Sequence, residues 1–154
     1  MLIYFCSFFS GYEHSVSGAF INYASFIEKF GEEFHGKKEI GVSLQQGIRV
    51  WFSIGAILAN SVQWWLSDRF LGRICTAQCG LVISILAIVL HIVAPNQVCF
   101  CAGRFFLGIG DAAVRYGTFL WVTESAVAPI RAASSGMWTF KMVVGGLMGL
   151  LVSR

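Results

Sequence analysis

The sequence predicts an all-α fold, a polytopic bundle of membrane-spanning helices. Of its 154 residues, 56% are hydrophobic and 12% are charged, about half the charged share of an average soluble domain. Its 14 Phe and 5 Trp give more apolar surface than a soluble chain of this length can hide. Apolar runs of spanning length also alternate with polar segments. These runs cover approximately residues 2–27, 48–66, 74–93, 98–122 and 135–152.

The first apolar run, residues 2–27, is aromatic and carries Glu13 near its middle. It has no basic start and is longer than the apolar core of a signal peptide. We therefore expect a spanning helix of about 39 Å. The mixed-charge stretch 28–39 follows, within a loop expected over residues 28–47.

The second run, 48–66, has tryptophans close to both of its ends, which is typical of helices anchored at the two membrane surfaces. A short loop, 67–73, leads to the third run. That run, 74–93, is almost purely aliphatic, so we expect much of its surface to face lipid. A tight turn over 94–97 leads to the fourth run.

The fourth run, 98–122, is the segment around which we expect the other helices to pack. At 100° per residue, Arg104, Asp111 and Arg115 fall on one helical face. Ionisable groups cost several kcal/mol at membrane depth. This face is therefore expected to line a water-filled cavity or to contact a partner helix.

The fifth run, 135–152, follows a loop expected over residues 123–134. Gly145 and Gly149 are four residues apart in this run. Small residues at this spacing permit close contact between helices. We therefore expect the fifth helix to pack tightly against a neighbour.

The basic residues of the short loops predict the orientation of the bundle. Arg69 and Arg73 lie in the loop 67–73 and Arg131 lies in the loop 123–134, whereas the turn at 94–97 has no basic residue. Short loops rich in Arg and Lys stay in the cytoplasm. The N-terminus is therefore expected inside, with the loop 28–47 outside.

Other classes of function find no support in the residues. The net charge is only +3 and no basic run points to nucleic acid as a partner. The five cysteines lack CxxC spacing and are odd in number, so we interpret them as buried apolar thiols. We find no nucleophile–base pair and no metal cluster, and expect neither enzymatic activity nor a cofactor.

The fourth run also carries a motif. The spacing of Arg104, Gly108, Gly110, Glu124 and Arg131 is in register with GRxxxGxGxGxxxxxxPxYxxExxPxxxRG. This pattern resembles the fourth helix of the sugar porter branch of the major facilitator superfamily, particularly its fungal members. The sequence departs from that pattern at Ala112, Phe119, Trp121 and Ala132, and the family proline after Glu124 is displaced to Pro129.

Two further blocks resemble the same family. The stretch GYEHSVSG, residues 11–18, is similar to the first-helix motif GYDxGxxxG, with Glu13 in place of Asp. The stretch SDRFLGR, residues 67–73, is similar to the loop signature GxxxDRxGRR. The resemblance covers essentially the whole chain. It implies the first five helices of the N-terminal half of a twelve-helix carrier.

The resemblance implies transport of a sugar, or of a related polyol or organic solute, by alternating access coupled to protons. The implied location is the plasma membrane, and the implied partners are lipid, a sugar-like solute, protons and the C-terminal half of the carrier. The alternative is a truncated, non-transporting membrane protein that associates with related carriers, or a decayed gene product.

The resemblance also implies roles for individual residues. Glu13 would accept the coupled proton and Arg104 would switch its affinity, although a static ion pair is the simpler interpretation. A cytoplasmic gate, whose arginines would also set the topology, would be formed by a charge network of Asp68, Arg69, Gly72, Arg73, Glu124 and Arg131.

The substrate cavity is expected to involve the fourth and fifth helices. Asp111 and Arg115 could form a local salt bridge or contact the substrate. Trp138 could stack on a sugar ring or simply pack. Thr139 stands where many sugar porters have a Gln, and a hydroxyl reaches less far than an amide. Lys141 is unexpected at membrane depth.

Overall fold

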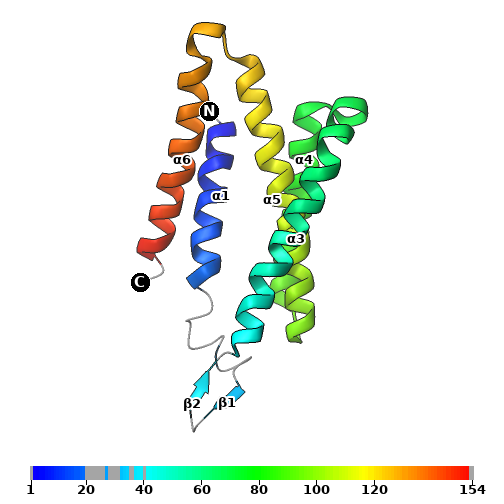
Figure 1. Ribbon diagram of the computed structural model, residues 1–154, viewed down its shortest axis with the longest axis vertical. Coiled ribbons are helices and arrows are strands. Elements are labelled where there is room, and N and C mark those ends of the chain that lie inside the picture. The colour runs from blue at the N-terminus through cyan, green and yellow to red at the C-terminus, as the bar shows by residue number, and fades with distance from the viewer. Residues whose placement is uncertain (1, 20–26, 28–31, 35–36, 40, 153–154) are drawn as a thin grey trace.

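The computed structural model describes residues 2–19, 27, 32–34, 37–39 and 41–152, which form an all-α bundle (Figure 1). The long helices among these residues are α1 (Leu2–Ala19), α3 (Val42–Leu66), α4 (Gly72–Val93), α5 (Gln97–Ser125) and α6 (Arg131–Val152). The expected continuation of the first helix over 20–26 lies outside the described residues.

The expected polar loop contains a small hairpin that the sequence did not predict. Strand β1 (Glu32–Phe34) pairs antiparallel with β2 (Lys37–Glu39), and this register places Glu33 opposite Lys38. The hairpin lies at one end of the bundle (Figure 1). A two-stranded hairpin of this length is not stable alone.

Two connections are more helical than expected. Helix α3 begins at Val42, within the stretch expected as loop, and the Gln45 N–H donates to the Gly41 carbonyl at 3.2 Å. The expected loop after it forms a π-helix, Ser67–Leu71. Gly72 follows with φ of 71°, a left-handed conformation that favours glycine, and this residue turns the chain into α4.

The connection between α5 and α6 is short. Helix α5 ends at Ser125, a 3-10 turn covers Ala128–Ile130, and α6 begins at once with Arg131. Pro129 lies in the first positions of this turn, where its missing N–H costs nothing. The last helix is therefore longer than the apolar run that predicted it.

Helix α5 is the centre of the bundle. It packs along both α3 and α4, whereas α1 packs mainly along α6, and smaller contacts join α5 to α1 and α6. Figure 1 shows the α1–α6 pair beside the group of α3, α4 and α5. Sequence-distant helices, the first and the last, thus lie side by side.

Glycine allows the closest of these contacts. A Cβ built on Gly108 of α5 would collide with the Phe52 carbonyl oxygen of α3, and one on Gly145 of α6 would collide with the Phe8 carbonyl oxygen of α1. Only a residue without a side chain permits such approach of two backbones.

Three helical segments within the described residues are long and apolar enough to cross a membrane. They are Gly72–Val93, Gln97–Ser125 and Ala128–Val152, so the described parts of α1 and α3, which the sequence predicted to span, are not among them. The first has a mean hydropathy of 2.2, yet only 17% of its most apolar window is buried. Exposed Leu86 and Ile92 illustrate this outer surface. A helix so apolar and so little covered is suited to lipid contact.

The two ends of the bundle carry different connections. The start of α1, the π-helix and the 3-10 turn lie at one end, the top of Figure 1. The hairpin and the connection between α4 and α5 lie at the other end. The basic loops noted in the sequence therefore share one end.

Candidate functional site

A charged pair joins the two helix groups. Arg104 Nη1 on α5 lies 3.7 Å from Glu13 Oε1 on α1. The arginine side chain is 4% exposed and the carboxylate 21% exposed, so the pair is largely shielded from solvent. The guanidinium also lies over the Phe100 ring, 5.5 Å from its centroid. The carboxylate and the ring both stabilise a cation buried in this way.

A cavity of about 410 Å³ lies beside this pair. Its walls come from α1, α4 and α5, with His91 and aromatic residues such as Tyr12 among them, and both Glu13 and Arg104 contribute to its lining. The ion pair therefore borders a space of the size that ligand pockets have.

A second charged cluster lies further along the same face of α5. Asp111 is 7% exposed, and its Oδ1 accepts a hydrogen bond of 2.6 Å from Ser10 Oγ. Its Oδ2 lies 2.9 Å from Arg115 Nη2 and 3.6 Å from His14 Nε2. The carboxylate is therefore shared between α5 and α1.

The sequence indicated only part of this cluster. Spacing of four residues pointed to the Asp111–Arg115 pair, but Ser10 and His14 were not chosen as site residues. Their signal was the helical spacing of Ser10, Glu13 and His14, which places three polar side chains on one face of α1.

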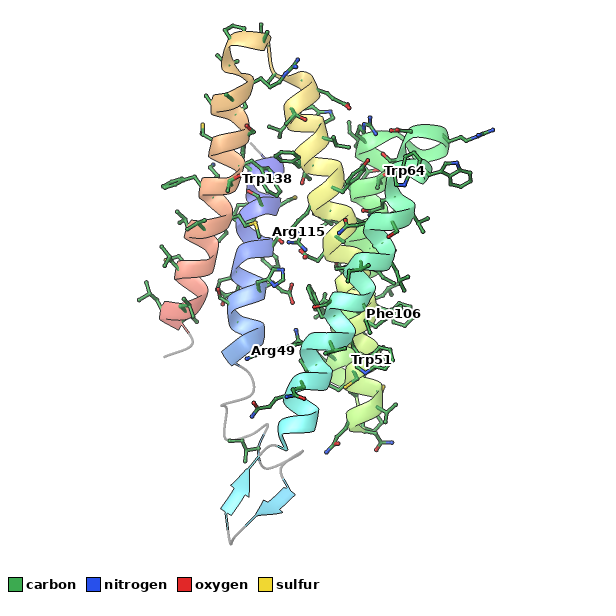
Figure 2. The ribbon with its side chains drawn as sticks, viewed as in Figure 1. Arg49, Trp51, Trp64, Phe106, Arg115 and Trp138 are labelled. Atoms are coloured by element: carbon green, nitrogen blue, oxygen red, sulfur yellow. The ribbon has the colours of Figure 1, made fainter. Side chains whose placement is uncertain are left out.

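An open groove of about 380 Å³ lies where α3, α5 and α6 meet. Arg115 and Trp138 both line it, and Figure 2 places these two side chains between α5 and the α1–α6 pair. The Trp138 and Phe119 rings meet edge to face with centroids 5.2 Å apart. The full lining is Asn60, Ala112, Arg115, Tyr116, Phe119, Trp138 and Met142.

Of the four residues expected in the substrate cavity, three lie at or next to this groove and one does not. Arg115 and Trp138 line the groove, and Asp111 lies behind Arg115. Thr139 is exposed and is not among the lining residues; its hydroxyl donates to the Ser135 carbonyl at 3.2 Å. The structure therefore does not bring Thr139 together with the other three.

A third charged cluster lies at the end of the bundle that holds the basic loops. Arg73 Nη2 lies 2.8 Å from Glu124 Oε1, and Arg73 Nε donates to both Glu124 oxygens at 3.1 and 3.2 Å. Arg73 also pairs with Asp68 and lies 3.4 Å from the Ser67 hydroxyl. The cluster links the π-helix, α4 and α5.

The remaining residues of the expected network have other positions. Gly72 supplies the turn that places Arg73 near Asp68. Arg69 and Arg131 are exposed, and within the described part of the chain no ion pair joins either of them to the cluster. Three residues of the expected six therefore form the contact itself.

The described ranges contain no candidate metal site. No group of three or more His, Cys, Asp or Glu side chains there could hold a metal ion. The cysteines are free thiols at positions 6, 75, 79, 99 and 101.

Comparison with protein families identifies a relationship that covers the chain. A family described as "Sugar (and other) transporter" matches residues 1–154, and therefore the whole chain. A search of curated proteins finds no match.

Proposed function

The chain belongs to the sugar transporter family, a family of multi-pass integral membrane proteins, and from this premise we propose that it moves a sugar, polyol or related organic solute across the membrane by alternating access coupled to protons. In this proposal it supplies the N-terminal wall of a carrier. The observation that supports it best is the buried Glu13–Arg104 pair beside a cavity at the meeting of the two helix groups.

The pair is suited to proton coupling because it lies across α1 and α5. An arginine beside a carboxylate favours the ionised form, and apolar surroundings favour the protonated form. A shift of α1 along α5 that separates Glu13 from Arg104 would let the carboxyl group bind a proton. The return of Arg104 would then release it.

The Arg73 cluster is suited to a gate. Its members are partly exposed, with Asp68 at 55% and Glu124 at 50%, so each pair contributes only about 0–1 kcal/mol. Contacts this weak can form and break without a large barrier. We place this cluster on the cytoplasmic side of the plasma membrane, where Arg69 and Arg131 would favour the inside orientation.

Uptake measurements test the coupling. Cells without their own hexose carriers would express the protein, and accumulation of radiolabelled glucose would be followed with an inward proton gradient. Glu13→Gln is expected to lower gradient-driven accumulation at least tenfold, because the amide cannot carry a proton across. Exchange of labelled for unlabelled sugar, which needs no net proton movement, should persist.

The matched control is Glu33→Gln, which removes a carboxylate from the hairpin outside the apolar helices. It should leave accumulation unchanged. Accumulation of glucose that is equal with and without a proton gradient would reject coupling, and a complete lack of saturable uptake of sugars or polyols would reject transport.

A further inference from the structure

The long helices carry more positive than negative charge. Away from their ends, the described helices α1, α3, α4, α5 and α6 hold four cations and two carboxylates. The carboxylates, Glu13 and Asp111, each lie beside one arginine of α5. The cations are Arg49, Arg104, Arg115 and Lys141.

The additional cations have no carboxylate partner among the described residues. Lys141 on α6 is half-buried and lies over the Tyr4 ring, 5.2 Å from its centroid. It is three residues from Trp138, which lines the groove. Positive charge at membrane depth is costly unless it serves a ligand or a partner. The imbalance therefore favours an anionic solute near these helices.

The groove itself offers hydrogen-bond donors. Arg115 is 27% exposed and lines the groove, and its Nη2 lies 2.9 Å from Asp111 Oδ2. A guanidinium has five N–H donors on three nitrogens, so it can donate to Asp111 and to a ligand at once. Trp138 is 8% exposed, and its Nε1–H has no hydrogen-bond partner in the described part of the chain.

These donors distinguish between classes of solute. A sugar hydroxyl both donates and accepts, whereas a carboxylate only accepts and presents two oxygens. The planar fork of an arginine matches such a pair of oxygens, and this bond is about twice as strong as one between neutral groups. Asp111 holds Arg115 from behind and is itself held by Ser10, so the guanidinium is positioned before a ligand arrives.

We propose that the groove binds a hydroxylated carboxylate, a sugar acid, with Arg115 on the carboxylate and the Trp138 indole N–H on a ring or hydroxyl oxygen. Asn60, which lines the groove from α3, offers its side-chain amide to a hydroxyl group. This inference rests on the proposed transport function and names the solute class for it.

Binding to the purified protein in lipid nanodiscs tests the inference. Calorimetric titrations with glucuronate and with glucose would be compared at pH 7, where glucuronate is ionised. Glucuronate is expected to bind at least tenfold more tightly than glucose. Arg115→Gln should remove this preference and leave the affinity for glucose within about twofold. Arg115→Lys keeps the charge without the fork, and it should retain part of the preference.

The matched control is Arg131→Gln, which removes an exposed arginine from the end of the bundle. It should leave both affinities unchanged. Glucose bound as tightly as glucuronate, or a preference that survives in Arg115→Gln, would overturn the inference and leave sugar transport standing. No binding of either solute to the wild-type protein would count against both.

Discussion

Asp111 is, beside the Glu13–Arg104 pair, a second point at which the two helix groups meet. It is nearly buried, yet it accepts a hydrogen bond from Ser10 and lies within ion-pair distance of Arg115 and His14. Helix α1 otherwise packs mainly along α6. A buried carboxylate with three polar neighbours therefore contributes to how α1 is held against α5.

Removing this charge should destabilise the bundle. Asp111→Asn keeps the size of the side chain but leaves Arg115 without its counter-charge, so we expect the free energy of unfolding to fall by about 1–3 kcal/mol. Unfolding in detergent, followed by circular dichroism, measures this difference. Asp68→Asn, at an exposed carboxylate, is the control and should cost no more than about 1 kcal/mol. Equal losses in the free energy of unfolding for both variants would show that the buried position of Asp111 does not increase its contribution to stability.

Residue patterns predicted contacts within a helix better than contacts between helices. The Asp111–Arg115 pair followed from helical spacing alone. Its link to Ser10 did not, because a contact across helices depends on how each helix is rotated. The rotation of α6 also explains why Thr139, expected in the substrate cavity, does not line the groove. The next residue in sequence is rotated by about 100°, so a groove that receives Trp138 leaves its neighbour on another face.

The helices depend on backbone contact as much as on side-chain packing. Gly108 of α5 lies against the Phe52 carbonyl of α3, and Gly145 of α6 lies against the Phe8 carbonyl of α1. A backbone carbonyl cannot rotate away as a flexible side chain can. Added bulk at these positions must therefore push whole helices apart.

Gly108→Ala should destabilise the α3–α5 contact. We expect a loss of about 1–3 kcal/mol in the free energy of unfolding, as for other overpacked cores. Gly136→Ala is the matched control on α6, where a Cβ would meet nothing within 4 Å. There the better helix propensity of alanine should make the change neutral or slightly stabilising. Thermal unfolding in detergent compares the two, and a more stable Gly108→Ala protein would contradict the close contact.

Helix ends were harder to predict than helix centres. Apolar runs located the middle of each long helix, because a spanning segment must be apolar over most of its length. The ends depend on local turns instead. The positive φ of Gly72 and the 3-10 turn at Ala128–Ile130 allow the helices to continue into stretches that are polar or charged. Hydropathy contains no signal for such extensions.

The whole molecule has two chemically different ends. Arg69 lies in a connection at one end, and Arg73 and Arg131 lie at the helix starts next to the connections there, whereas the turn between α4 and α5, residues 94–96, has no basic residue. Arginine-rich short connections remain in the cytoplasm during insertion. The whole molecule is therefore expected to insert with the Arg73 cluster inside and the hairpin outside.

Cysteine labelling tests this orientation. The five native cysteines would first be replaced by Ala, and a single cysteine then placed by Arg69→Cys or by Asn96→Cys, two exposed positions at opposite ends. If the predicted orientation is right, a membrane-impermeant maleimide should label the Asn96→Cys protein in intact cells. It should label the Arg69→Cys protein only after the membrane is permeabilised, since the basic connections are expected inside.

Each pattern of labelling has a distinct meaning for the carrier. Reversed labelling would place the Arg73 cluster outside, and the cluster could then not act as a cytoplasmic gate. Labelling of both positions in intact cells would mean that the segments between them do not cross the membrane, contrary to the apolar surface of α4. Only one-sided labelling at residue 96 agrees with proton entry from outside toward Glu13 and with a gate that closes at the basic end.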